Sequence, residues 1–155
     1  MASAKPLINN EGKLHPCPNN RVWEGSFVMF EVSIEGHFSA AHQVFGHEGL
    51  TGRIHGHNYR VVVIVAGEDL NRLGFLIEFS AVKSALAQVI SYLDHESLND
   101  LEPFRVSQPT CEMLARYVYH NFMQSMLMLR ENLPAIHLQR VVIYESDAQS
   151  ATYSE

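Results

Sequence analysis

Two hydrophobic stretches near the start of the chain most constrain its fold. Within residues 27–39 apolar and polar residues alternate with a period of two, which predicts a strand with one face in water. Residues 58–67 form a nearly continuous run of valine and isoleucine, which indicates a strand buried on both faces. A loop rich in glycine and charge, residues 42–54, separates them. We therefore predict two strands of one sheet.

Two helices are predicted to follow these strands. Residues 78–93 carry apolar side chains at helical spacing, and Ser80 is a candidate N-cap near their start. Residues 94–108 are predicted to form a loop. A second helix opens at Pro109 and Thr110, and its broad apolar face extends to Leu129. The methionines of this helix are more typical of a core or an interface than of a binding site.

Residues 138–145 and 151–155 are predicted to form the last two strands. The order ββααββ predicts an α+β fold, a four-stranded antiparallel sheet with both helices on one face. At 155 residues the chain has room for one domain with a proper core, which we place at residues 28–155. Residues 1–27 are polar and contain proline, and we expect them to form a flexible N-terminal extension.

Charge and composition limit the partners of the chain. A net charge of −6, with only 11 scattered lysines and arginines, argues against nucleic acid as a partner. No apolar run approaches the ~20 residues that cross a bilayer, and the N-terminus lacks the apolar core of a secretory signal. We therefore expect no membrane partner and a cytoplasmic location, with Cys17 and Cys111 as reduced thiols.

The motif His55-Gly56-His57 opens the second predicted strand. In a strand, residues two apart point to the same face, so the two imidazoles lie side by side. Such a pair suits zinc, and His42 at the end of the preceding strand can supply a third ligand. Three protein ligands leave a fourth position open, as in catalytic zinc sites. The H-x-H motif alone is weak evidence for a metal, because it is more typical of solvent-facing histidines on a loop, and His37 and His47 are competing ligands.

Five motifs occur in a fixed order along the chain: FSAAH ending at His42, HGHNY from His55, LDH ending at His95, PTCE ending at Glu112 and VIYE ending at Glu145. From about residue 30 to residue 155 the chain resembles the 6-pyruvoyl-tetrahydropterin synthase family, including its 6-carboxy-tetrahydropterin synthase branch. The resemblance implies the tunnelling fold, in which the sheets of several subunits continue into a barrel. It further implies a homo-oligomer, typically a hexamer with active sites at subunit interfaces.

The same resemblance implies the substrate and the site. The substrate is 7,8-dihydroneopterin triphosphate, a pterin, and zinc is held by His42, His55 and His57. Asp94 and His95 belong to the catalytic proton relay, because a carboxylate beside an imidazole fixes its tautomer. Without the family context, this pair only ends a helix, where a histidine is favourable.

The pterin pocket is implied by a second set of residues. Glu145 receives the amino and ring N–H donors of the pterin, while Thr110 and Glu112 line the same pocket and Cys111 forms part of its wall. Structural roles are also open to two of them. Thr110 can cap the second helix, and Glu112 can stabilise the first turn of that helix through its dipole.

The chain departs from the family at one catalytic position. Thr51 stands where the family has a cysteine, four residues before the first histidine of HGH, and a hydroxyl is a much poorer base than a thiolate. One branch of the family uses a loop glutamate instead and releases a 6-hydroxymethyl pterin, which makes Glu48 a candidate catalytic base. Movement of Cys17 or Cys111 into the site is the less favoured alternative.

Two functional hypotheses follow for the chain. The first is a zinc-dependent lyase whose product is a pyruvoyl, carboxy or hydroxymethyl pterin. The second is a paralogue that binds zinc and pterin without turnover, which the missing cysteine motivates. A third, a zinc-stabilised assembly protein without a pterin role, is disfavoured because neither Glu145 nor the pair Asp94 and His95 is needed merely to hold a metal.

Overall fold

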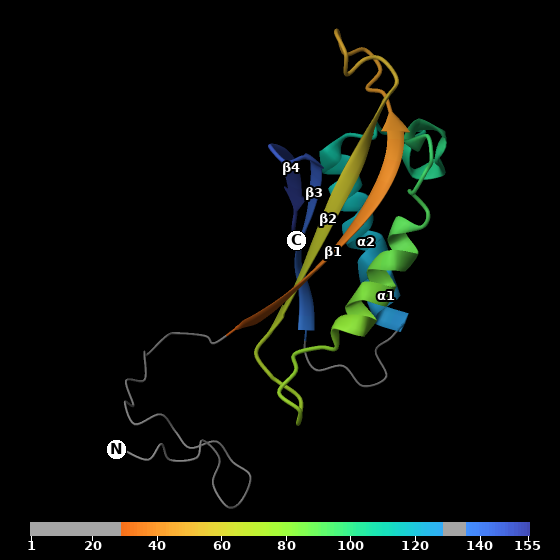
Figure 1. Cartoon of the computed structure of the whole chain (residues 1–155). Coiled ribbons are helices and arrows are strands. Elements are labelled where there is room, and N and C mark those ends of the chain that lie inside the picture. Colours follow the sequence, from red (N-terminus) through yellow and green to blue (C-terminus); the bar gives the residue numbers. More distant parts are fainter. Residues whose placement is uncertain (1–28, 129–135) are drawn as a thin grey trace, which may run out of the picture.

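The sheet and the two helices predicted from the sequence are present in the computed structural model of the chain, which describes residues 29–128 and 136–155 (Figure 1). The elements follow in the order β1 (Phe30–His42), β2 (His55–Gly67), α1 (Phe79–Ile90), α2 (Cys111–Met128), β3 (Ile136–Ser146) and β4 (Gln149–Tyr153). The predicted α+β class and the ββααββ order are therefore confirmed.

The four strands form one antiparallel sheet in the order β1-β2-β3-β4, so β1 and β4 are its edges. Both helices pack on one face, with α1 against β1 and α2 against β3 and β4 (Figure 1). In the ladder between β1 and β2, Phe30 pairs with Gly67 at one end and His42 pairs with His55 at the other. The pairing of these two strands therefore brings the histidine motifs to the same end of the sheet.

The core lies between this sheet and the helices. Tyr59, Val61 and Val63 are fully buried, and the ring of Phe38 stacks on that of Tyr59 with 4.8 Å between centroids. Because side chains alternate along a strand, His57 lies on the same side of β2 as Tyr59. The histidines of β2 therefore continue the core face of the sheet to its end.

Several predicted boundaries shift in the structure. β1 runs to His42, three residues beyond its predicted end, because the ladder with β2 continues to His55. The N-cap predicted at Ser80 is wrong: α1 begins at Phe79, and Glu78 occupies the cap position without a side-chain hydrogen bond. The predicted loop 94–108 contains two short 3₁₀ helices, Leu98–Asp100 and Glu102–Phe104.

The start of the second helix agrees better with the sequence. α2 begins at Cys111, and the hydroxyl of Thr110 accepts a 3.4 Å hydrogen bond from the backbone N–H of Met113, which confirms the predicted cap. Among the methionines of this helix, Met126 is buried while Met128 is exposed. The N-terminal extension predicted for residues 1–27, with Cys17, lies outside the described residues, as does Leu129.

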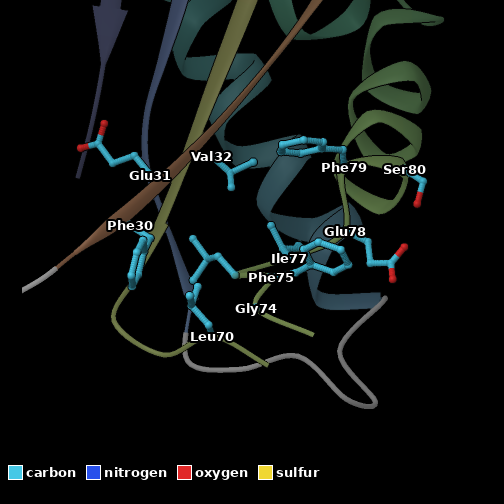
Figure 2. Close-up of a pocket in the computed structure, with 11 residues that line it drawn as sticks. Phe30, Glu31, Val32, Leu70, Gly74, Phe75, Ile77, Glu78, Phe79 and Ser80 are labelled. Carbon is cyan, nitrogen blue, oxygen red and sulfur yellow. The ribbon is translucent and has the colours of Figure 1, made fainter. Parts of the chain in front are cut away.

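An apolar cavity of about 460 Å³ lies at the opposite end of the sheet from the histidines (Figure 2). Phe30, Leu70, Phe75 and Phe79 are among the residues that line it. It lies about 40 Å from His42 along the 13 residues of β1. The lining contains no imidazole or thiol, so this cavity takes no part in the site described below.

Among the described helices, none has the length and apolar character needed to cross a membrane.

Candidate functional site

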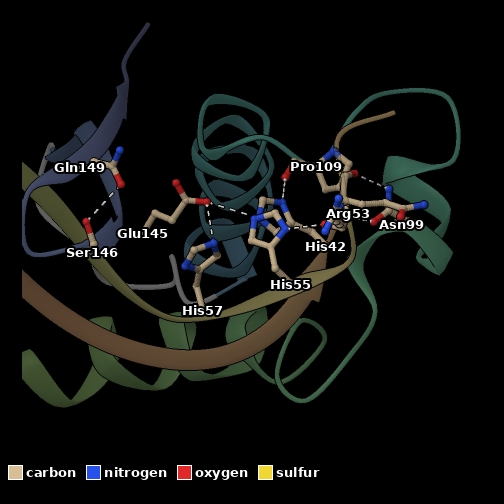
Figure 3. A network of polar contacts seen from close by, with 10 residues as sticks. His42, Arg53, His55, His57, Asn99, Pro109, Glu145, Ser146 and Gln149 are labelled. Carbon is tan, nitrogen blue, oxygen red and sulfur yellow. Dashed lines mark hydrogen bonds and ion pairs between the residues drawn. The ribbon is translucent and has the colours of Figure 1, made fainter. Parts of the chain in front are cut away.

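Three histidines and one glutamate meet where β1 ends and β2 begins (Figure 3). His42 is the last residue of β1, His55 and His57 open β2, and Glu145 lies near the end of β3. One ligand atom from each of the four residues lies within 4.8 Å of all the others. The three histidines predicted from the sequence are thus brought together, and the structure adds Glu145 to them.

Backbone carbonyls orient two of these imidazoles (Figure 3). His42 Nδ1 lies 2.8 Å from the carbonyl oxygen of Pro109, and His55 Nδ1 lies 2.7 Å from that of Arg53. A carbonyl oxygen can only accept, so each Nδ1 carries the proton and each Nε2 keeps its lone pair. Carbonyl partners of this kind fix metal-ligating histidines in orientation and tautomer.

The free nitrogens fit a cation. Within the described part of the chain, the Nε2 atoms of His42 and His57 are buried and have no hydrogen-bond partner, which is costly unless something else satisfies them. Burial lowers the pKa of His57, although Glu145 opposes the shift, and this favours the neutral imidazole that can ligate a metal. Three imidazoles with a carboxylate form a donor set that suits Zn²⁺.

A cavity of about 320 Å³ opens beside this metal group. His42 and Glu145 line it together with Thr110, Cys111 and Glu112, so the predicted pterin-pocket residues share one cavity with the metal group. Burial, with added repulsion from Glu145 and Glu112, raises the pKa of the Cys111 thiol to about 12. Cys111 is therefore a neutral thiol at neutral pH and forms a wall of the cavity, as the sequence suggested, rather than acting as a base.

The loop between β1 and β2 also contributes to this cavity. Thr51 and His47 line it and Glu48 does not, although His47 and Glu48 are both exposed. Sequence reasoning named His47 only as a competing metal ligand and missed its place in the cavity. No spacing rule distinguishes it from Glu48, because both lie between Gly46 and Gly49, two glycines with positive φ.

Side-chain amides fix the start of this loop. Asn99 exchanges two hydrogen bonds of 2.9 Å with the backbone of Gln43, and Gln108 does the same with Phe45 at 3.0 and 3.1 Å. Further along, a Cβ at Gly52 would collide with the carbonyl oxygen of His47. Hydrogen bonds thus hold the loop against the segment that leads into α2. Glycine at position 52 allows the loop backbone to pass close to His47.

Asp94 and His95, the residues predicted to relay the proton, contact each other beside the edge strand β1. Asp94 Oδ1 accepts a 2.9 Å hydrogen bond from the backbone N–H of Ser39 and lies 3.0 Å from His95 Nδ1. The hydrogen bond from Ser39 is the main cause that lowers the pKa of Asp94, and His95 adds to it. His95 has φ of 63°, a left-handed conformation that is uncommon for residues other than glycine, although histidine adopts it more readily than most.

His95 of this pair lines a different cavity from that of Glu145. His95, Ser39, Asn58 and His57 line a space of about 440 Å³. His57 borders this space, and His42 borders the cavity that contains Thr110 and Glu112. Within one chain the metal group therefore adjoins both cavities. The chain does not bring Asp94 and His95 into the cavity of the pterin-pocket residues.

Comparisons with known proteins identify the family of the chain. The family model described as 6-pyruvoyl tetrahydropterin synthase matches residues 31–155. A 6-carboxy-5,6,7,8-tetrahydropterin synthase from Bacillus subtilis (strain 168) is 41% identical over 110 residues, which cover 68% of this chain and 73% of that protein. A dihydroneopterin monophosphate aldolase from Pyrococcus furiosus is 30% identical over 111 residues, covering 71% and 84% of the two chains.

A solved structure extends the likeness to the fold. The 6-pyruvoyl tetrahydropterin synthase of Caenorhabditis elegans superposes with a TM-score of 0.72 at 25% sequence identity, covering 83% of this chain and 97% of that one. The four-stranded sheet, the two helices and the family match over residues 31–155 agree with one another. The chain belongs to the 6-pyruvoyl tetrahydropterin synthase family.

Proposed function

We propose that the chain is a zinc-dependent lyase that acts on 7,8-dihydroneopterin triphosphate. The observation that carries the proposal is the direct contact between two features: the metal group and the cavity lined by Thr110, Cys111 and Glu112. Membership of a family of pterin enzymes supports a pterin as the small-molecule substrate. When bound, zinc would act as a Lewis acid on the side-chain hydroxyls of the substrate, which eases the loss of the adjacent proton.

The residues of the cavity bind and orient the pterin. Glu145 offers a carboxylate to the amino and ring N–H donors, a pairing of two acceptors with two parallel donors. Thr110 caps α2, which fixes the wall of the cavity that Cys111 and Glu112 continue. The predicted structural role of Thr110 thus coexists with a binding role.

Asp94 and His95 move the proton. Asp94 Oδ1 lies 3.0 Å from His95 Nδ1, so the carboxylate holds the proton on this nitrogen and leaves Nε2 free to act as a base. The backbone N–H of Ser39 holds the carboxylate in place. His95 is 81% exposed, and its imidazole is accessible to a substrate.

Two loop residues are candidates for the second acid–base group, in place of the family cysteine. Glu48 corresponds in kind to the glutamate of the hydroxymethyl-forming branch, and the match to an aldolase supports that branch. His47 is favoured by its position, because it lines the cavity and Glu48 does not. Thr51 lines the cavity as well, but its hydroxyl is too weak a base to replace a thiolate.

The proposed function includes a homo-oligomer, a hexamer as the resemblance implies. β1 and β4 are edge strands, and pairing them with other copies would satisfy their free backbone groups. Association would also bring the cavity of Asp94 and His95 on one subunit toward the pterin cavity of another. The alternative function, a pterin-binding paralogue without turnover, is favoured only by Thr51 in place of the cysteine.

Matched loop variants test the assignment of the base. We expect His47→Gln to lower kcat for 7,8-dihydroneopterin triphosphate by a factor of about 10² to 10⁴, the usual contribution of a general base. Glu48→Gln is the control, and it should keep most of the activity because Glu48 does not line the cavity. Substrate consumption by the zinc-loaded protein is the readout. The reverse result would assign the base to Glu48, and full activity in both variants would exclude the loop as its source.

A further inference from the structure

Glu145, which we propose binds the pterin, also lies in direct contact with two of the histidines. Its Oε1 atom is 3.1 Å from His57 Nε2 and 3.3 Å from His42 Nε2 (Figure 3). In a tetrahedral zinc site with bonds of about 2.0–2.1 Å, neighbouring ligand atoms are about 3.3 Å apart. Oε1 therefore stands at the distance of a further ligand from both nitrogens.

The orientation of His42 explains why these atoms need a cation between them. His42 Nδ1 donates its proton to the carbonyl of Pro109, so in the neutral imidazole Nε2 presents a lone pair. The carboxylate oxygen of Glu145 also presents lone pairs, and the contact does not have hydrogen-bond geometry. Two acceptors at 3.3 Å repel each other in a site where His42 is only 2% exposed, unless a proton or a metal ion lies between them.

The backbone around Glu145 allows its side chain to change direction. The ladder between β2 and β3 ends at the pair of Arg60 and Tyr144, one residue before Glu145. On the other side of β3, the pairing with β4 is irregular between Tyr144 and Ser146. Irregularities of this kind beside active sites commonly direct a side chain away from its regular course. Glu145 is thus not fixed by regular pairing on either side.

We propose that Glu145 is the fourth protein ligand of the metal in the absence of substrate, and that the pterin ring draws this carboxylate away from the metal. Four protein ligands close a zinc site as in structural centres, whereas catalysis needs an open position. Release of Glu145 would open that position only when a pterin is bound. The release of Glu145 by the pterin rests on the proposed function, but the assignment of Glu145 as a metal ligand does not.

The two roles of Glu145 oppose each other. Two parallel donors of the pterin ring engage both carboxylate oxygens, and Oε1 is the atom that faces the histidines. The ring and the metal therefore compete for one carboxylate. By linkage, the factor by which the ring weakens metal binding equals the factor by which the metal weakens binding of the ring.

Metal affinity tests the ligand assignment without any turnover. Zinc affinity is measured by competition with a chelator for the unaltered protein, Glu145→Gln and Glu112→Gln. Loss of a ligand is expected to weaken zinc binding in Glu145→Gln by at least about 10- to 100-fold, the range already seen for outer-sphere partners. Glu112→Gln is the matched control, since it removes a carboxylate from the same cavity but not from the metal group. Equal affinity in all three proteins would overturn the assignment.

Cobalt absorption tests the release. Co²⁺ replaces zinc, and 6-methylpterin is added, a compound that keeps the ring donors but lacks the side-chain hydroxyls that could bind the metal. We expect the visible spectrum of the unaltered protein to change with added pterin and to approach that of Glu145→Gln. Binding of the pterin with an unchanged spectrum would overturn the release alone. No binding to the unaltered protein would overturn both the release and the proposed pterin site, with the zinc affinities still deciding the ligand assignment.

Discussion

His57→Ala is expected to lose bound metal and nearly all activity toward 7,8-dihydroneopterin triphosphate. The substitution removes one of three imidazoles from the metal group, and His57 also borders the cavity that His95 lines. Lewis-acid stabilisation of several kcal/mol corresponds to a rate loss on the order of 10³-fold or more. Metal content by elemental analysis and initial rates at saturating substrate provide the two readouts.

His37→Ala is the control for this experiment. His37 belongs to β1, as His42 does, but its side chain is exposed and it is not part of the metal group. It should keep both metal and activity. If His57→Ala retained a full equivalent of metal together with normal turnover, the metal group would not be the catalytic centre.

Asp94→Asn should lower kcat by a factor of about 10² to 10⁴ while leaving the metal content unchanged. An amide can still accept the hydrogen bond from Ser39, but it has no negative charge to hold the proton on His95 Nδ1. Because its pKa is lowered, the Asp94 carboxylate stays ionised even below the ordinary range for an aspartate, and its contribution is lost only as the pH falls through that lowered value. The loss of rate should therefore be similar throughout the neutral range.

Glu96→Gln is the matched control for this substitution. Glu96 lines the same cavity and neighbours the pair in sequence, but it does not contact His95 through its carboxylate in the structure. Unchanged kcat in Asp94→Asn, with a loss in Glu96→Gln, would remove Asp94 from the proton relay and transfer the role to Glu96.

Local patterns predicted most of the fold and the three histidines. The alternation in β1 and the valine run in β2 follow from a period of two, and the same period places His55 and His57 on one face. The start of α1 could not be derived in this way. Ser80 has the chemistry of a cap, but the helix begins one residue earlier, after the buried pair Leu76 and Ile77.

The second part of the site depends on contacts that no local pattern specifies. Glu145 joins the histidines because β3 pairs with β2 in the sheet. Its contact with His57 therefore links two residues that lie far apart in the sequence. The choice between His47 and Glu48 depends on loop geometry set by glycines with positive φ. Sequence motifs identified the type of chemistry, whereas the arrangement of the loop and of β3 determines which residues can take part in it.

The most direct test is to incubate the zinc-loaded protein with 7,8-dihydroneopterin triphosphate and to identify the products by mass. We expect complete, zinc-dependent conversion to a pterin with a shortened or dephosphorylated side chain. A 6-pyruvoyl or 6-carboxy product would show that the family cysteine is dispensable here, and a 6-hydroxymethyl product would place the chain with the glutamate-using branch. Substrate recovered unchanged, with zinc bound and the pterin retained, would contradict the lyase and establish a binding protein instead.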